Sequence, residues 1–328
     1  MRKRNVVTDL AIEAHEMLCA EENASTIDGI IVKEEDLGEI KIATVKITNE
    51  SGENTLGKPI GNYITIESRA VKERNKEIHE QIIKILADVI GNLHGLKSDG
   101  VILVVGLGNR NVTPDALGPR AAERVLVTRH LKNEGIIPKE IENKVRSVAA
   151  IAPGVLGLTG IETYEIVKGI TDRIKPDLIV AIDALAAREL SRINSTIQIS
   201  DTGLSPGAGL GNNRIKLNEK TLGVKVLAIG VPTVVDAATL VNDTLDGILG
   251  DLSKQSENGQ AFYETLARLE SEEKYPMILS ALKPYDGNMF VTPKEIDNVI
   301  NDLSAIIADA LNIALNEGIT QDDVWKYS

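Results

Sequence analysis

Two aspartates lie next to apolar runs that are typical of buried strands. Asp115 follows the run 101–105 after a short loop, and Asp183 follows the run 178–182 directly. Open α/β sheets bind their ligands beyond the carboxyl ends of parallel strands, which is where both residues would then stand. A carboxylate in such a place is costly to desolvate unless it is paired or used in catalysis. Each aspartate taken alone is also compatible with capping a turn or a helix.

Two carboxyl groups brought together would titrate as a coupled pair that shares one proton. The ionised member can draw a proton from water, and the protonated member can polarise a peptide carbonyl and later give its proton to the leaving amine. This is the chemistry of an aspartic-type peptidase. Composition and periodicity do not show whether Asp115 and Asp183 meet in space, so the sequence alone leaves the pair a hypothesis.

Two other motifs match known catalytic patterns only in part. The stretch GENTLGKP at 52–59 fits a phosphate-binding P-loop as far as Lys58, but Pro59 replaces the hydroxyl residue that would bind magnesium. The stretch GLSPG at 203–207 fits the serine turn of a hydrolase, but Pro206 has no N–H for the oxyanion hole. Nucleotide hydrolysis and serine-hydrolase chemistry are therefore disfavoured.

The sequence also gives little support to a cofactor or a metal. The turn at 106–108 lacks the third glycine of a dinucleotide fingerprint, because Asn111 stands in its place. The single Cys19 excludes an internal disulfide and a zinc site built from several cysteines. Metal-ligand spacing is missing among the histidines, His15, His79, His94 and His130. We therefore expect no cofactor and no metal.

Hydrophobic periodicity predicts the elements that would position the two aspartates. Short apolar runs predict strands at 101–105, 148–151, 178–182, 196–199 and 226–229. A helical period predicts helices at 78–93, 115–131, 162–174 and 235–252. This alternation predicts an α/β fold whose mainly parallel sheet is covered by helices on both faces. Extra strands are predicted before it, at 27–32, 40–48 and 63–66.

Two helix starts have clear local signals. Thr113 and Pro114 predict an N-cap and a first helical residue, which places Asp115 in the first turn. Thr292 and Pro293 predict the same start for a final helix. The first 10 to 20 residues are polar and weakly periodic, and we expect them to form an arm outside the core.

Composition limits the classes of partner. The chain has 328 residues and a net charge of −12, which disfavours a general binder of nucleic-acid backbones. The length allows one large domain or two smaller ones. No run approaches the roughly 18 apolar residues of a membrane helix, and the N-terminus lacks the apolar region of a secretory signal. We expect a cytoplasmic protein that binds neither nucleic acid nor membrane.

Long blocks of the sequence resemble the germination proteases of endospore-forming bacteria. The resemblance extends from TDLA at 8–11 to VTPKEID at 291–297, nearly the whole chain. The most specific blocks are VGLGNRNVTPDALGP at 105–119, PDLIVAIDALA at 176–186, IQISDTG at 197–203 and AIGVPTVVDA at 228–237.

The resemblance implies an aspartic-type endopeptidase of the spore core that degrades small acid-soluble spore proteins during germination. It also implies a zymogen trimmed at its N-terminus, a homotetramer, and a three-layer α/β sandwich similar to that of hydrogenase-maturation proteases. The two aspartates implicated in the family's catalysis correspond by motif to Asp115 and Asp183.

The resemblance further implies cleavage between an acidic residue and a large apolar one. The stretch TDLAIE at 8–13 is similar to the substrate motif Thr-Glu-(Ile or Phe)-Ala-Ser-Glu, with Asp9 before the cut and Leu10 after it. We therefore predict a propeptide arm at 1–9 and a single catalytic domain at 10–328. A positive group should meet the acidic side chain, and the candidates are Arg110, Arg120 and Arg188. The alternative is an ordinary polar arm that starts a short helix at Thr8.

Two other functions stay open. A metal-dependent maturation-type endopeptidase of the same fold would need a histidine ligand downstream of the aspartates, but no histidine follows His130. A non-catalytic binding protein of this fold could use the same arm as an interaction tail.

Overall fold

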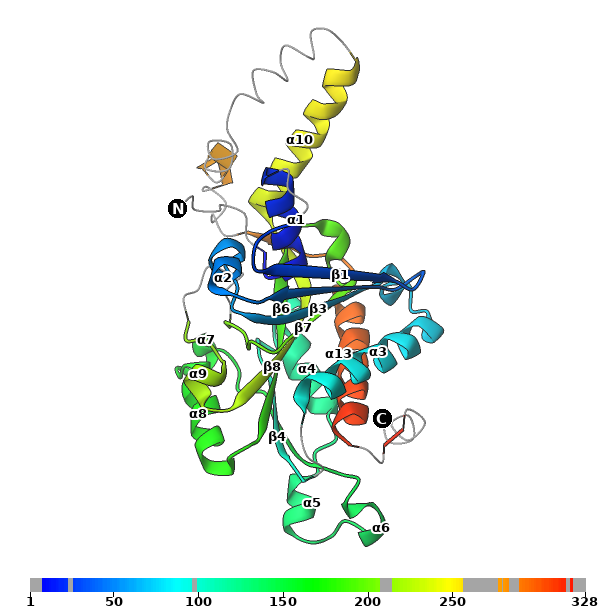
Figure 1. Cartoon of the computed structure of the whole chain (residues 1–328), viewed down its shortest axis with the longest axis vertical. Helices are drawn as coiled ribbons and strands as arrows, with labels where there is room; N and C mark the ends of the chain where they lie inside the picture. Colours follow the sequence, from blue (N-terminus) through cyan, green and yellow to red (C-terminus); the bar gives the residue numbers. More distant parts are fainter. Residues whose placement is uncertain are drawn as a thin grey trace.

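A mixed β-sheet with helices on both of its faces forms the body of the protein (Figure 1). The computed structural model describes residues 8–22, 26–95, 99–206, 214–255, 277–278, 280–282, 289–316 and 319–320. The predicted α/β fold, with helices on both sides of the sheet and additional N-terminal strands, is confirmed.

The described strands run in the order β1-β2-β3-β7-β8-β6-β4-β5, and β9 pairs with β8. The pairs β4–β5, β4–β6 and β6–β8 are parallel, whereas β1, β2, β3 and β7 join the sheet by antiparallel pairs. In chain order the strands are β1 (Ile30–Asp36), β2 (Lys41–Ile47), β3 (Gly61–Glu67), β4 (Val101–Gly106), β5 (Ser147–Ile151), β6 (Leu178–Ala187), β7 (Thr196–Ser200), β8 (Lys225–Asp236) and β9 (Phe290–Val291).

Helices cover the parallel half of the sheet because its strands are apolar on both faces. On one face α3, α4 and α13 pack against the sheet, and on the other face α8 and α9 do. The helices are α1 (Ala11–Glu22), α2 (Glu50–Leu56), α3 (Lys76–His94), α4 (Leu117–Arg124), α5 (Arg129–Asn133), α6 (Lys139–Glu142), α7 (Leu156–Thr159), α8 (Thr163–Ile174), α9 (Glu219–Leu222), α10 (Ala237–Gln255) and α13 (Ile296–Leu315). The 3₁₀ turns are η1 (Arg69–Val71), η2 (Thr113–Asp115) and η3 (Leu190–Arg192).

The helix α13 is long and apolar enough to cross a membrane by length and composition alone. Its apolar stripe is instead packed against α3, α4 and the sheet. Ile300, Leu303, Ile307 and Leu311 on this stripe are completely buried. The helix therefore belongs to the protein core.

The prediction of an N-terminal arm outside the core is wrong for residues 8–22, the part of this segment that the structure describes. Residues 11–22 form α1, and Leu10, Ala11 and Leu18 are buried in a core shared with β2, β3 and the end of β6. The polar residues of this segment are also paired, since the buried Glu13 carboxylate accepts the backbone N–H groups of Arg188 and Glu189. Residues 1–7 of the predicted propeptide lie outside the described residues.

Both predicted helix starts are displaced. Thr113, Pro114 and Asp115 form the turn η2, and α4 begins only at Leu117. The predicted helix 115–131 is broken because residues 125–128 contact other elements, with Leu126 N–H bound to the Asn312 side chain. The helix α13 begins at Ile296 with Glu295 at its N-cap. The Thr292 hydroxyl donates to the Thr233 carbonyl instead of capping the helix.

Candidate active site

The end of β4 brings Asp115 to the neighbouring strand β6. Gly106 is the last residue of β4 and pairs with Ile182, and the Leu107 N–H continues this contact to the Ile182 carbonyl at 2.8 Å. The chain then turns back through η2, and Asp115 Oδ2 accepts the Asn109 N–H at 2.6 Å. Gly108 permits this turn, because its φ is +114° and an added Cβ would lie 2.0 Å from the Asp115 carbonyl oxygen.

Asp183 lies inside β6 rather than at its end. The strand continues to Ala187 because residues 183–187 pair with residues 230–235 of β8. The residue is 6% exposed, and its Oδ1 accepts the Ala184 N–H at 3.0 Å. Burial raises the pKa of Asp183 well above its usual range, and the negative charges of Asp115 and Asp9 raise it further. Asp183 therefore keeps its proton at a pH where an exposed aspartate is ionised.

Asp115 differs from Asp183 in its depth of burial and in the negative charges that act on it, since Asp115 and Asp9 both raise the pKa of Asp183. Burial raises the pKa of Asp115, but the Asn109 N–H and the guanidinium of Arg214 oppose that shift. Asp183 is more deeply buried and is the one whose pKa stands well above the usual value. Both predicted aspartates therefore line one cavity, and Asp183 is the one whose burial and neighbours favour the protonated form more strongly.

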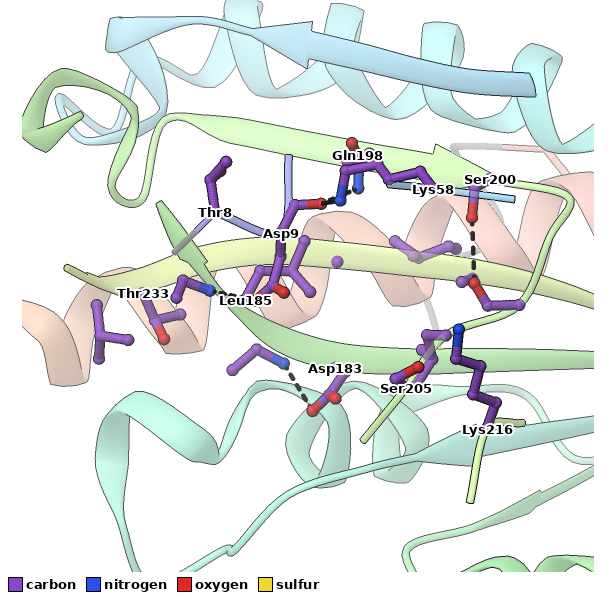
Figure 2. Close-up of a pocket in the computed structure, with 18 of the residues that line it drawn as sticks. Thr8, Asp9, Lys58, Asp183, Leu185, Gln198, Ser200, Ser205, Lys216 and Thr233 are labelled. Atoms are coloured by element: carbon purple, nitrogen blue, oxygen red, sulfur yellow. Dashed lines mark hydrogen bonds between the residues drawn. The ribbon is translucent and has the colours of Figure 1, made fainter. Parts of the chain in front are cut away.

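Both aspartates line a cavity of about 900 Å³. Figure 2 shows Asp183 in this cavity together with Asp9, Lys58 and Gln198. Asp9, Lys58 and Gln198 line the same cavity, so it contains the acidic residue of the predicted processing site as well as the predicted catalytic residues.

The N-terminal segment passes beside β6 at this cavity. Asp9 N–H donates to the Ala186 carbonyl at 3.0 Å, and the Ala186 N–H donates to Asp9 Oδ2 at 2.9 Å. The Asp9 carbonyl oxygen accepts Lys58 Nζ at 2.9 Å and Gln198 Nε2 at 3.2 Å. Burial raises the pKa of Asp9, while Lys58 and the Ala186 N–H lower it. Both the carboxyl group and the carbonyl oxygen of Asp9 are therefore held by hydrogen bonds.

The predicted arginines have other partners and do not explain how the Asp9 carboxyl is held. Arg110 donates to Glu123, Arg120 to the Asp297 carbonyl and Arg188 to Asp243. The cations that line the described part of the cavity are Lys58, Arg214 and Lys216. The prediction selected these arginines only by their charge and their place in the sequence. In the structure their side chains are held by neighbouring carboxylates and a carbonyl oxygen.

Sequence reasoning missed Lys58, Gln198 and Arg214. Lys58 was noticed only as part of the failed P-loop pattern, although it follows directly on the C-cap of α2, Gly57. Gln198 was visible as a polar residue in the apolar run TIQIS of β7, which is a signal for an inward-facing functional side chain. Arg214 had no distinguishing local pattern.

The buried carboxyl of Asp183 should oppose folding at neutral pH. Its pKa in the unfolded chain is near the usual 3.8, and its pKa in the folded protein is higher. The folded state therefore binds this proton more tightly, so the contribution of Asp183 to stability is most favourable at acid pH and is lost as the pH rises from 3.8 through the folded pKa. We expect Asp183→Asn to unfold at a higher temperature than the unchanged protein at pH 7, with the difference shrinking toward pH 4.

Calorimetry across this pH range measures the effect. The asparagine keeps an acceptor for the Ala184 N–H, and the exposed Asp28→Asn serves as the matched control. A variant that is less stable than the unchanged protein at pH 7 would contradict the assignment of Asp183 as a buried acid.

Comparison with known proteins identifies the family. The family profile described as germination protease matches residues 11–268 and 250–328. The germination protease of Clostridium tetani is 50% identical over 98% of this chain and 99% of its own length. That of Caldanaerobacter subterraneus subsp. tengcongensis is 49% identical over 97% of this chain and 96% of its own length.

A solved structure, the [NiFe] hydrogenase maturation protease HycI from Thermococcus kodakarensis, is 20% identical and gives a TM-score of 0.29. That similarity covers 44% of this chain and 80% of the other, and it supports no statement about function. The profile and the full-length relatives are decisive. This chain belongs to the germination protease family, and it is a peptidase with a role in spore germination.

Proposed function

We propose that this protein is a self-processing, aspartic-type endopeptidase that degrades small acid-soluble spore proteins. The observation that carries the proposal is that Asp9, the residue before the predicted cut, lines the same cavity as Asp115 and Asp183. An acidic side chain, a large apolar side chain and two carboxyl groups of unequal proton affinity are thus gathered in one place.

In the proposed reaction the Asp115 carboxylate takes a proton from water, and the water oxygen attacks the Asp9 carbonyl carbon. The bond between this carbon and the Leu10 nitrogen then breaks, and Asp183 gives its proton to the leaving nitrogen. The products are a carboxylate at Asp9 and an amine at Leu10. The proton affinities of the two aspartates support this division of roles.

The cleavage preference follows from how the two residues are held. The carboxyl of Asp9 accepts the Ala186 N–H and lies near the Lys58 charge, which suits an acidic residue before the cut. The Leu10 side chain is completely buried in an apolar cluster with Ile12 and Val235, which suits a large apolar residue after it. We propose the same two positions for spore-protein substrates.

The surroundings of the enzyme are part of the proposal. We place it in the cytoplasm of the spore core, as a zymogen with the propeptide 1–9 and as a homotetramer, with neither nucleic acid nor membrane as a direct partner. Membership of the germination protease family supports the role in the spore. Light scattering during size-exclusion chromatography tests the tetramer.

Cleavage should not depend on a metal ion. Among the described residues that line the cavity there is neither histidine nor cysteine, and its acidic and basic side chains are three aspartates, two lysines and one arginine. Exhaustive chelation should therefore leave the activity of the processed enzyme unchanged. Loss of activity on chelation, with recovery on adding Ni²⁺ or Zn²⁺, would instead favour the metal-dependent maturation-type endopeptidase.

The substrate class is tested by incubating the purified protein with a small acid-soluble spore protein and mapping the fragments by mass spectrometry. We expect cuts after an acidic residue and before a large apolar one. Stable binding of the spore protein without cleavage would favour the non-catalytic binding protein.

A further inference from the structure

One carbonyl oxygen in the cavity receives two side-chain hydrogen bonds that the reaction above does not use. Lys58 Nζ and Gln198 Nε2 both donate to the Asp9 carbonyl oxygen, at 2.9 and 3.2 Å. Figure 2 shows the two side chains on the same side of Asp9, with Asp183 on the other side of the cavity. The two donors thus converge on the oxygen of the peptide bond that is proposed to be cut.

Gln198 also holds the segment on the far side of that bond. Its Oε1 accepts the Ala11 N–H at 2.7 Å. An amide whose oxygen must face an N–H presents its NH₂ group to the other partner, so the contact with Ala11 fixes the orientation of the donor. Gln198 itself is 8% exposed and lies in β7, where it pairs with Thr65 of β3 and Gly230 of β8. The donor is therefore carried by a rigid part of the sheet.

Lys58 is placed independently of Gln198. It follows Gly57, the C-cap of α2, whose φ of +72° ends that helix and directs the chain toward the cavity. Burial lowers the pKa of Lys58, while Asp9 and Glu13 favour its charged form and Lys216 opposes it. A lysine donates a hydrogen bond in either state, and the charged form stabilises a negative oxygen more strongly.

We propose that Lys58 and Gln198 form the oxyanion hole of this peptidase. The inference rests on the proposed cleavage between Asp9 and Leu10. When the water oxygen bonds to the carbonyl carbon, the π electron pair moves onto the carbonyl oxygen, where the two donors stabilise the negative charge. The pair returns when the carbon–nitrogen bond breaks. Lys58 and Gln198 neither gain nor lose a covalent bond, and the proton of Asp183 stays available for the leaving nitrogen.

An oxyanion hole can be distinguished from a site that only binds the segment. It changes the rate of cleavage and leaves the binding of the uncut segment in the cavity unchanged. The first-order rate of self-cleavage in the full chain reports on the chemistry. Hydrogen exchange of the amides of residues 9–12 reports on whether the segment stays in the cavity, since Asp9 N–H and Ala11 N–H are both bonded there.

We expect Lys58→Met and Gln198→Glu each to slow self-cleavage about 10²- to 10³-fold, the usual effect of removing one oxyanion donor, with exchange protection retained. Glutamate keeps the acceptor for the Ala11 N–H but cannot donate to the Asp9 carbonyl oxygen. Lys58→Arg restores a donor and should recover part of the rate. Lys72→Met, a lysine that does not line the cavity, is the matched control and should cleave at the normal rate.

Two outcomes would overturn the inference. Rates within a few-fold of the unchanged protein would show that the donors do not act on the reacting oxygen. A slow rate accompanied by loss of exchange protection would make Lys58 and Gln198 docking residues only. Asp183→Asn is measured in parallel, because continued cleavage by that variant would contradict the proposed function and not the oxyanion hole.

Discussion

Asp183→Asn should slow both self-cleavage and cleavage of a spore protein by about 10³-fold or more while the protein stays folded. Asparagine has the size of aspartate and still accepts the Ala184 N–H, but it cannot give a proton to the leaving nitrogen. The measurement is the rate of fragment formation by mass spectrometry, with circular dichroism to confirm the fold.

Asp115→Asn should have an effect of the same order for the complementary reason. Asparagine keeps an acceptor for the Asn109 N–H but cannot take a proton from water. The exposed Asp28→Asn, which changes the net charge equally, should cleave at the normal rate. Full cleavage of the spore protein by either cavity variant would remove that residue from the catalytic pair.

The second large effect is expected from a substitution of Asp9, the residue before the predicted cleavage site. Asp9→Lys should block self-processing, with a rate loss of about 10³-fold, because the Ala186 N–H loses its acceptor and a second lysine is brought next to Lys58. Edman sequencing of the incubated variant measures the remaining cut. Asp9→Glu keeps the carboxylate and is the matched control, which should still be processed. Normal processing of Asp9→Lys would show that the acidic side chain does not direct the cut.

The sequence was sufficient to predict the elements that local hydrophobic patterns determine. The apolar runs around 101–105 and 178–182 predict β4 and β6, and these two strands place Asp115 and Asp183 on one cavity. The extension of β6 beyond Asp183 was not visible, because it depends on pairing with β8, which lies more than forty residues further along the chain.

Local patterns failed where the partners are distant in sequence. Lys58 contacts Asp9 across 49 residues and Gln198 contacts it across 189, so neither spacing forms a motif. The segment after Asp9 has the composition of a solvated arm, yet Glu13 is 1% exposed and lies 3.8 Å from Arg192. Polar residues of this kind enter a core only when distant groups pair with them, and a single sequence does not show those pairs.

Acidic pH should favour processing. Burial raises the pKa values of Asp9, Asp115 and Asp183, and the charges of Asp9 and Asp115 act on Asp183. As the pH falls below 7, protonation of Asp9 or Asp183 reduces the repulsion among these carboxylates, so the rate should rise. It should fall again once Asp115 also holds a proton and no base is left.

The most direct test is the N-terminal sequence of the full-length protein after incubation at mildly acidic pH, beside Asp183→Asn under the same conditions. A two-aspartate peptidase that processes itself predicts a new terminus at Leu10 in the unchanged protein and an uncut chain in the variant. An intact Met1 or Arg2 in a fully active enzyme, or the same new terminus in Asp183→Asn, would contradict it.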